Sequence, residues 1–181
     1  MTAHEPGIAA RVRLLVLDCD GVLTDGSITY DDRGHELKTF NVRDGLGLRA
    51  WLNAGFEAAV ITGRGGPALA RRAGELGIKH LIEGSSDKRT ALEQLAADTG
   101  IRLEQTAVMG DDWPDLAMFD LAGYSIAPAD AHADLRARAH FVTPSVGGRG
   151  AVREAVEHLL SARDLLDAAR KASHAGSSLR S

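Results

Sequence analysis

The chain has 181 residues, of which 44% are hydrophobic and 25% charged, and these values are ordinary for one globular domain with a sizeable core. The formal net charge is −4 and Lys and Arg are spread along the chain, which excludes the basic field of a nucleic-acid binder. A single cysteine, Cys19, excludes an intramolecular disulfide, and no apolar run approaches the ~20 residues of a membrane span, so we expect a cytoplasmic protein that does not enter a membrane.

Short apolar runs alternate with helical patterns along most of the chain. Strands are predicted at residues 13–18, 57–61, 80–83 and 106–109, with short edge strands at 124–127 and 139–142. Helices are predicted at 45–54, 67–76, 88–98, 115–121 and from 151 to about 171. This alternation is typical of a Rossmann-like α/β fold, with a parallel sheet and helices on both faces.

Residues 27–40 interrupt the alternation. β-Branched and aromatic residues lie on both sides of an Asp-Asp-Arg-Gly turn, a pattern that predicts a projecting β-hairpin after the first strand. We therefore divide the chain into an N-terminal arm (1–12), one domain (13–171) with its hairpin (26–41), and a tail (172–181). The tail has too few apolar residues to pack.

The strongest chemical signal is LLVLDCDGVLTD, residues 14–25. A buried strand runs into Asp18 and Asp20, and period-two alternation places these carboxylates on one side and Cys19 on the other. Ligands of open α/β sheets bind at the carboxyl ends of the strands, and two acids so close favour a cation or a retained proton. Acidic residues after a strand also form ordinary turns, and that alternative stays open for this motif alone.

Two further strand ends could bind an anion. Thr62 and Gly63 end the strand of VITGR (60–64), where the threonine hydroxyl and backbone N–H could donate to a phosphate. Lys88 lies in the first turn of a predicted helix, against the helix dipole, so a nearby anion would explain it. An N-capping threonine and a solvated surface lysine are the alternatives.

A fourth strand end is acidic. In AVMGDDWPDLAMF (107–119), Asp111, Asp112 and Asp115 surround the start of a helix. They could cap that helix or supply oxygen ligands to a hard cation. Four such strand ends in this order are far more specific than any one of them.

Together these motifs resemble the haloacid dehalogenase superfamily, and more closely its 3-deoxy-D-manno-octulosonate 8-phosphate (KDO 8-phosphate) phosphatase branch. The resemblance runs from about residue 13 to 160. Besides the four strand ends it includes KTFNVRDGLGL (38–48) and GGRGAVREAVEHLL (147–160).

The resemblance implies a catalytic role for the first motif. Asp18 would attack phosphorus and form an aspartyl-phosphate, while Asp20 would act first as general acid and then as general base. Mg²⁺ would be held by the Asp18 carboxylate, the Asp20 backbone carbonyl and Asp111.

The other strand ends receive binding roles by the same resemblance. Thr62, Gly63 and Lys88 would bind the oxygens of the phosphoryl group. Asp112 and Asp115 would orient Lys88 or the waters of the metal. Phosphoryl transfer needs this kind of positioning and charge neutralisation more than elaborate covalent chemistry.

The spacing of the motifs leaves no room for a cap domain. The interval from Asp18 to Thr62 already holds a hairpin and a helix, and that from Lys88 to Asp111 holds one helix and one strand. An open site weakens electrostatic interactions, so a neighbouring subunit is expected to close it. The resemblance implies a homotetramer in which hairpins associate and residues 147–150 reach an adjacent site.

Arg64 and Arg72 bear on the substrate, which the resemblance implies to be a small phosphorylated sugar acid. These arginines are similar in position to sugar-carboxylate binders, although ordinary surface arginines are the alternative. Related nine-carbon phosphatases carry an acidic residue where Arg64 stands, so Arg64 favours KDO 8-phosphate. The alternatives are a nonulosonic acid 9-phosphate, another small phosphate ester, or a non-catalytic subunit of the same fold.

Overall fold

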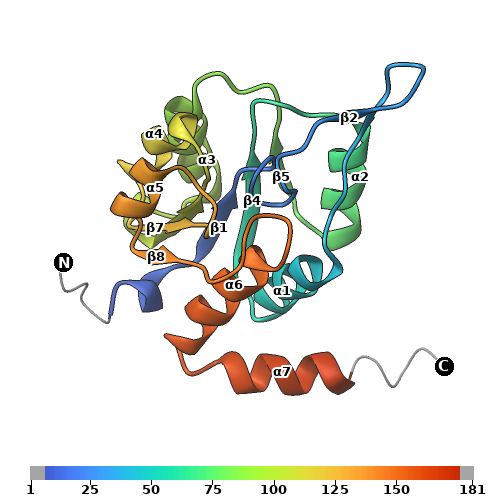
Figure 1. Ribbon diagram of the computed structural model, residues 1–181. Coiled ribbons are helices and arrows are strands. Elements are labelled where there is room, and N and C mark those ends of the chain that lie inside the picture. The colour runs from blue at the N-terminus through green and yellow to red at the C-terminus, as the bar shows by residue number, and fades with distance from the viewer. Residues whose placement is uncertain (1–6, 176–181) are drawn as a thin grey trace.

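A six-stranded parallel sheet forms the centre of the computed structural model, which describes residues 7–175. The strands are β1 (Leu14–Leu17), β4 (Glu57–Ile61), β5 (His80–Ile82), β6 (Thr106–Met109), β7 (Tyr124–Ala127) and β8 (Phe141–Val142). They lie in the order β5-β4-β1-β6-β7-β8 (Figure 1). The predicted α/β class is confirmed, and the central position of β1 places its end between two neighbouring strand ends.

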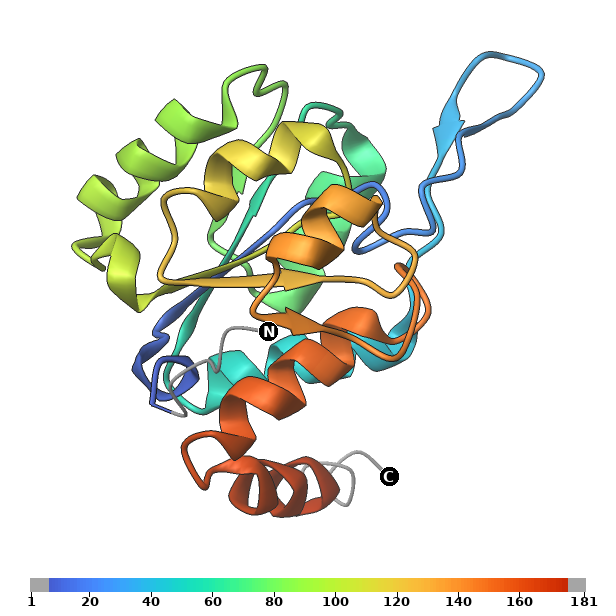
Figure 2. The ribbon, with the colours of Figure 1, turned by 60° about the vertical axis from the view of Figure 1, so that its left-hand side comes forward.

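Helices cover both faces of the sheet because the strands are apolar on both sides. Leu15 and Leu17 of β1 face a core shared with α1 (Val42–Asn53), α2 (Pro67–Leu76) and α6 (Ala151–Ser161). Leu14 and Val16 face a second core, shared with α3 (Lys88–Thr99), α4 (Leu116–Phe119) and α5 (Ala133–Arg138). Figure 2 shows these two layers on opposite sides of the sheet, with α7 (Leu166–Ala175) packed beyond α1 and α6.

Capping residues explain where the helices begin. The Asn41 side chain accepts a hydrogen bond from a backbone N–H of the first turn, so α1 begins at Val42 rather than at the predicted residue 45. The Asp87 side chain caps α3 in the same way, and this helix begins at Lys88 as predicted. The described residues also form three single turns of 3-10 helix: η1 (Ala9–Arg11), η2 (Leu103–Gln105) and η3 (Trp113–Asp115).

The second half of the chain differs from the sequence-based predictions in three places. The strand β7 is not at an edge, because β8 pairs with it on its outer side. The short helix α5 was not predicted. The last predicted helix is broken after α6 by a turn in which Asp164 has a φ of 58°, so α7 leaves in a new direction. This α7 extends into the predicted tail as far as residue 175, and residues 176–181 lie outside the described part.

The hairpin projects from the body of the protein in both ribbon views (Figures 1 and 2). Its strands β2 (Thr29–Tyr30) and β3 (Glu36–Leu37) pair antiparallel within the predicted segment. Asp31 stabilises the turn, because its Oδ1 accepts hydrogen bonds from two backbone N–H groups of the turn. Among the described residues, no helix has the length and apolar character that a membrane crossing requires.

The described part of the N-terminal arm, from residue 7, is packed rather than extended. Ala9 in η1 and Val12 are buried against the core that α1 and α6 share. The arm therefore closes one end of that core before β1 begins.

Candidate active site

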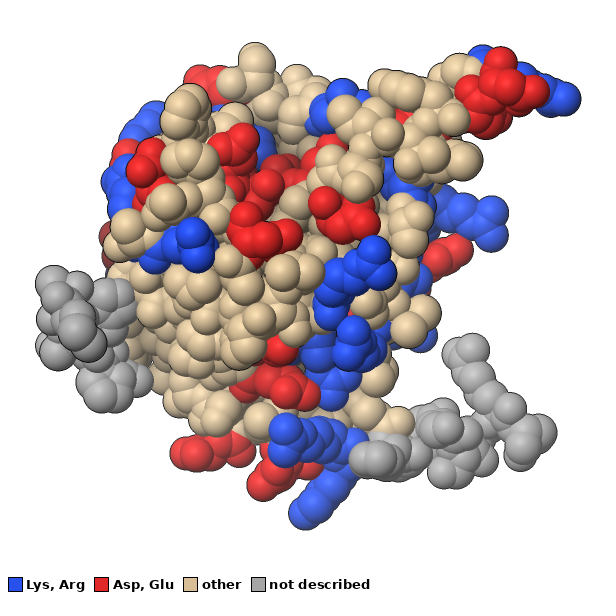
Figure 3. Space-filling view, in the orientation of Figure 1, with Lys and Arg blue, Asp and Glu red and all other residues tan. Residues whose placement is uncertain are grey.

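The four predicted strand ends meet at the carboxyl edge of the sheet. Asp18 follows β1, Thr62 follows β4, and Gly110 with Asp111 follows β6, while Lys88 opens α3 after β5. Asp18, Thr62, Lys88 and Asp111 line a pocket of about 430 Å³, whose other lining residues are Asp20, Gly26, Gly63, Arg64, Ser85, Ser86, Asp112, Pro114 and Asp115. In the space-filling view, acidic side chains gather around a hollow on the same side as the hairpin base (Figure 3). The topology therefore assembles all four motifs at one place.

Lys88 is a buried cation that lines this pocket. Its Nζ lies 3.0 Å from Asp18 Oδ1 and 2.6 Å from Asp115 Oδ1, and only 6% of its side chain is exposed. Burial by itself lowers the pKa of Lys88, but the charges of Asp115 and Asp18 outweigh it and raise that pKa. The alternative of a solvated surface lysine is wrong, and Lys88 stays charged beside the Asp18 carboxylate.

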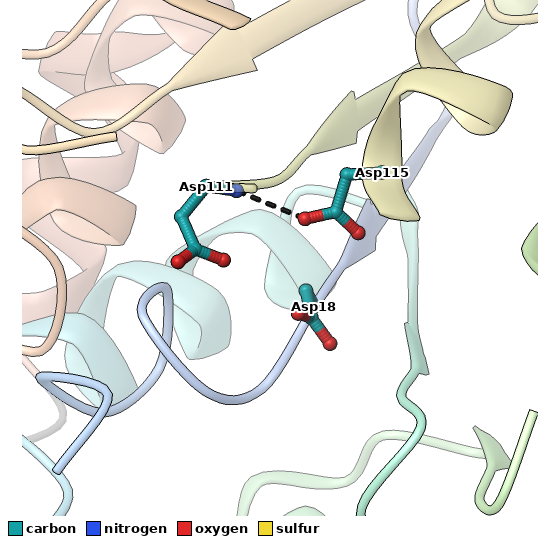
Figure 4. Close-up of side chains that lie close together, drawn as sticks. All are labelled: Asp18, Asp111 and Asp115. Atoms are coloured by element: carbon teal, nitrogen blue, oxygen red, sulfur yellow. Dashed lines mark hydrogen bonds between the residues drawn. The ribbon is translucent and has the colours of Figure 1, made fainter. Parts of the chain in front are cut away.

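The carboxylates of Asp18, Asp111 and Asp115 converge at this place (Figure 4). One oxygen from each lies within 4.8 Å of the others. Burial, followed by the charge of Asp115, raises the pKa of Asp18 to about 6 and that of Asp111 to about 7. Uncompensated negative charge is what a hard cation relieves, and carboxylate oxygens are the ligands that Mg²⁺ prefers, so this donor set fits Mg²⁺.

Gly21 allows Asp111 to take its position. A Cβ built on Gly21 would fall directly on the Asp111 carboxylate, and the backbone φ of Gly21 is 80°. Any larger residue would therefore clash with the carboxylate and would strain the turn after Asp20.

Asp115 links the backbone of the fourth motif to Lys88. Its Oδ2 accepts hydrogen bonds from the backbone N–H groups of Asp111 (3.0 Å) and Asp112 (3.3 Å), while its Oδ1 binds Lys88. Asp112 caps the turn η3 by accepting from the Trp113 N–H at 2.8 Å. Helix capping, one of the two alternatives for this motif, is therefore present at Asp112, while the role of the acids as cation ligands stays a prediction.

Thr62 is buried at the end of β4, next to Gly63. Its backbone N–H donates to the Ile82 carbonyl at 2.9 Å as part of the sheet, so the expectation that this N–H could serve an anion was wrong. Its hydroxyl lies 3.2 Å from both the N and the O of Arg64 and lines the pocket. Only the hydroxyl of Thr62 can reorient toward a phosphate.

The two arginines lie in different places. Arg64 lines the pocket, where its guanidinium is 3.2 Å from Glu36 Oε2 and its Nε is 3.6 Å from Asp20 Oδ2. Arg72 lies on α2, with its guanidinium turned against Gly45 of α1 and 3.4 Å from Glu75. The structure does not bring Arg72 into the pocket of its own chain, so its role in substrate binding stays a prediction.

Lys38 and Glu36 of the hairpin contact two residues of the pocket, Asp20 and Arg64, and the sequence did not predict these contacts. Lys38 Nζ lies 2.5 Å from Asp20 Oδ1 and 3.2 Å from Glu36 Oε1. The two residues are two positions apart, so their side chains lie on the same side of the extended hairpin segment. This spacing was the only feature of the sequence that could have linked them. No pattern in the sequence indicated that this side faces Asp20.

Comparisons with known proteins identify relatives of this chain. A family model described as haloacid dehalogenase-like hydrolase matches residues 72–155. The 3-deoxy-D-manno-octulosonate 8-phosphate phosphatase of Yersinia pestis is 47% identical over 161 residues, which cover 89% of this chain and 86% of that protein. The Escherichia coli K12 enzyme of the same name is also 47% identical, over 90% of this chain and 86% of its own.

Solved structures extend the likeness to the fold. The Moraxella catarrhalis 3-deoxy-D-manno-octulosonate 8-phosphate phosphatase, in complex with magnesium ion, phosphate ion and KDO, superposes with a TM-score of 0.90 at 42% identity. That match covers 92% of this chain and 96% of the other. The Yersinia pestis phosphatase crystal structure gives a TM-score of 0.87 at 46% identity, over 90% of this chain and 89% of the other.

Proposed function

The chain belongs to the 3-deoxy-D-manno-octulosonate 8-phosphate phosphatase family of haloacid dehalogenase-like hydrolases, and from this premise we propose that it is a Mg²⁺-dependent phosphatase that converts KDO 8-phosphate to KDO and phosphate. One observation carries the proposal. Asp18 ends the central strand beside a buried Lys88, in a pocket where two further carboxylates converge. Such a pocket combines a nucleophile with charge neutralisation, and phosphoryl transfer needs both.

The chemistry divides between the two acids of the first motif. An Asp18 oxygen attacks phosphorus as the bond to the sugar oxygen breaks, and the phosphoryl group passes to Asp18. Asp20 gives its proton to the departing sugar oxygen and becomes a carboxylate. It then takes a proton from the water that attacks the aspartyl-phosphate, which releases phosphate and restores both acids.

Mg²⁺ fits the carboxylates of Asp18 and Asp111, and by family resemblance the backbone carbonyl of Asp20 joins them. When bound, it neutralises negative charge on the phosphoryl oxygens and on Asp18. Lys88 supplies a fixed positive charge beside Asp18, as the distance of 3.0 Å between its Nζ and Asp18 Oδ1 supports.

The phosphoryl oxygens are assigned to Lys88, the Thr62 hydroxyl and Gly63, all of which line the pocket. Asp115 holds Lys88 and the backbone of the metal-binding turn, and Asp112 caps that turn. These assignments give each residue a task that its position permits.

The sugar carboxylate is assigned to Arg64, which lines the pocket and is 44% exposed along its side chain. A guanidinium can bind a carboxylate through two parallel hydrogen bonds. Arg72 would serve this role only toward a sugar that extends beyond the described pocket.

We extend the proposal to a homotetramer closed by neighbouring subunits, in the cytoplasm. The hairpin supports the assembly, because Ile28, Tyr30 and Leu37 are each more than half exposed there. The compartment is supported by Cys19, the only cysteine of the chain, which is buried and free.

Phosphate release by the purified protein tests the function. With Mg²⁺, KDO 8-phosphate should be hydrolysed with a higher kcat/KM than a nonulosonic acid 9-phosphate or p-nitrophenyl phosphate. Asp18→Asn, a nearly isosteric change, should abolish release and keep the circular dichroism spectrum of the wild type. Preference for the nine-carbon ester would reassign the substrate, and turnover by Asp18→Asn would refute the covalent route.

A further inference from the structure

Asp20, the proposed acid and base, is held by a closed set of charges that we call the hairpin ring, made of Asp20, Lys38, Glu36 and Arg64. Lys38 lies 2.5 Å from Asp20 Oδ1 and 3.2 Å from Glu36. Arg64 lies 3.2 Å from Glu36 and 3.6 Å from Asp20 Oδ2. Charges alternate around the ring, so each group has an opposite charge on both sides.

The two oxygens of Asp20 differ in this arrangement. Oδ1 accepts from Lys38 and, at 3.4 Å, from the Thr24 hydroxyl. Oδ2 is buried and accepts no hydrogen bond from the described residues, with Arg64 as its cation at a longer distance. Lys38 therefore makes the shortest of the contacts that fix the Asp20 side chain.

Lys38 differs from an ordinary surface lysine. Only 4% of its side chain is exposed, although it lies on a hairpin whose neighbours Leu37 and Thr39 are exposed. An exposed ion pair restrains its partner only weakly, because both ends can exchange for water. A desolvated ammonium at 2.5 Å from its partner restricts that partner far more strongly.

From this geometry, and resting on the proposed function, we infer that Lys38 is a positioning residue: through Oδ1 it holds the Asp20 carboxyl group in the orientation from which Asp20 protonates the departing sugar oxygen. Glu36 keeps the Lys38 ammonium in place from the other side. The hairpin is therefore part of the catalytic apparatus of its own subunit, in addition to presenting an apolar surface outside.

The test distinguishes an effect of Lys38 on protonation of the leaving group from an effect on substrate binding or folding. Lys38→Met is compared with the wild type for kcat/KM on two substrates, KDO 8-phosphate and p-nitrophenyl phosphate. The sugar leaves as a strongly basic alkoxide and needs a proton, whereas p-nitrophenolate is a weak base that leaves without one. kcat/KM reports the steps up to expulsion of the leaving group, so the later attack of water does not enter it.

We expect kcat/KM of Lys38→Met to fall roughly 10- to 100-fold on KDO 8-phosphate, a part of what general acid catalysis contributes, and less than about threefold on p-nitrophenyl phosphate. Lys38→Arg, which keeps a cation, should recover most of the loss. Arg33→Met is the matched control: it removes an exposed hairpin cation outside the ring and should behave as wild type on both substrates.

Two outcomes overturn the inference while the wild type remains an active phosphatase. Equal losses on both substrates would assign Lys38 to substrate binding or to folding, and unchanged activity on both would make the contact incidental. If Lys38→Met does not fold, Glu36→Gln replaces it in the test. Its kcat/KM should fall selectively on KDO 8-phosphate, by less than for Lys38→Met. A kcat/KM that changes by the same factor on both substrates, or on neither, would refute the role of the ring. A wild type that is inactive on KDO 8-phosphate would refute the proposed function instead.

Discussion

Replacing Lys88 by Met should lower both the stability and the activity of the protein, and the contacts of this residue allow the effect to be estimated. The Lys88 ammonium lies between Asp18 and Asp115, whose side chains are 11% and 1% exposed. Met has a similar length and fills the same space without charge. The substitution therefore leaves two buried carboxylates facing each other without their shared cation.

The magnitude follows from the distances. With an effective dielectric constant of about 20, the Coulomb attraction of Lys88 is about 5.5 kcal/mol to Asp18 at 3.0 Å and about 6 kcal/mol to Asp115 at 2.6 Å. The cost of burying the three charged groups offsets most of this attraction, and removal of one partner from a buried pair costs about 3–5 kcal/mol. In a domain of this size 1 kcal/mol shifts Tm by about 2–4 °C, so we expect a loss of about 10 °C.

Thermal unfolding in EDTA and in Mg²⁺, at one protein concentration, measures this effect. The loss should be largest in EDTA and smaller in Mg²⁺, because the metal also neutralises Asp18. Phosphate release at saturating Mg²⁺ should fall about 10²–10³-fold, as for loss of one preorganised charge on a transition state. Lys79→Met, at an exposed position, is the control and should change the free energy of unfolding by no more than about 0.5 kcal/mol. A Lys88→Met variant within about 2 °C of wild type in EDTA would refute the reasoning.

Two other predictions concern the metal and a partly buried histidine. EDTA should inactivate the wild type and Mg²⁺ should restore it, while Asp111→Asn should need at least about tenfold more Mg²⁺ for half-maximal phosphate release; activity indifferent to chelation would contradict the metal site. Burial lowers the pKa of His158, whose Nε2 lies 2.7 Å from the Tyr124 hydroxyl, so the folded state binds fewer protons than the unfolded one. The stability contributed by neutral His158 is present above the unfolded pKa of about 6.5 and is lost as pH falls below it. Urea unfolding from pH 7 to 5.5 should therefore weaken the wild type more than His158→Gln, and equal losses would exclude His158 as the cause.

Local patterns predicted the strands and most helices, because buried strands require apolar residues and helix starts favour particular capping residues. The strands at 57–61, 106–109 and 124–127 agree with the structure in both bounds. The start of α3 was predicted correctly because Asp87 is a strong capping residue. The break between α6 and α7 was missed, since a left-handed Asp164 has no distinctive pattern around it.

The order of strands in the sheet was outside what periodicity can determine. A short apolar run predicts a strand but not its neighbours, so the predicted edge position of residues 124–127 was wrong. Its outer partner β8 has only two residues, too few for a clear pattern.

By itself the sequence determined the fold class and the motif residues of the candidate site, because their chemistry is set by residue type and by position at strand ends. Asp18, Thr62, Lys88 and Asp111 could be chosen in this way before any distance was known. Only the tertiary structure decided which charged groups form ion pairs and how deeply each group is buried. It placed Lys88 between two carboxylates, engaged the Thr62 N–H in the sheet, and brought Lys38 from the hairpin to Asp20. Those contacts depend on packing between segments distant along the chain, and no local pattern encodes such packing.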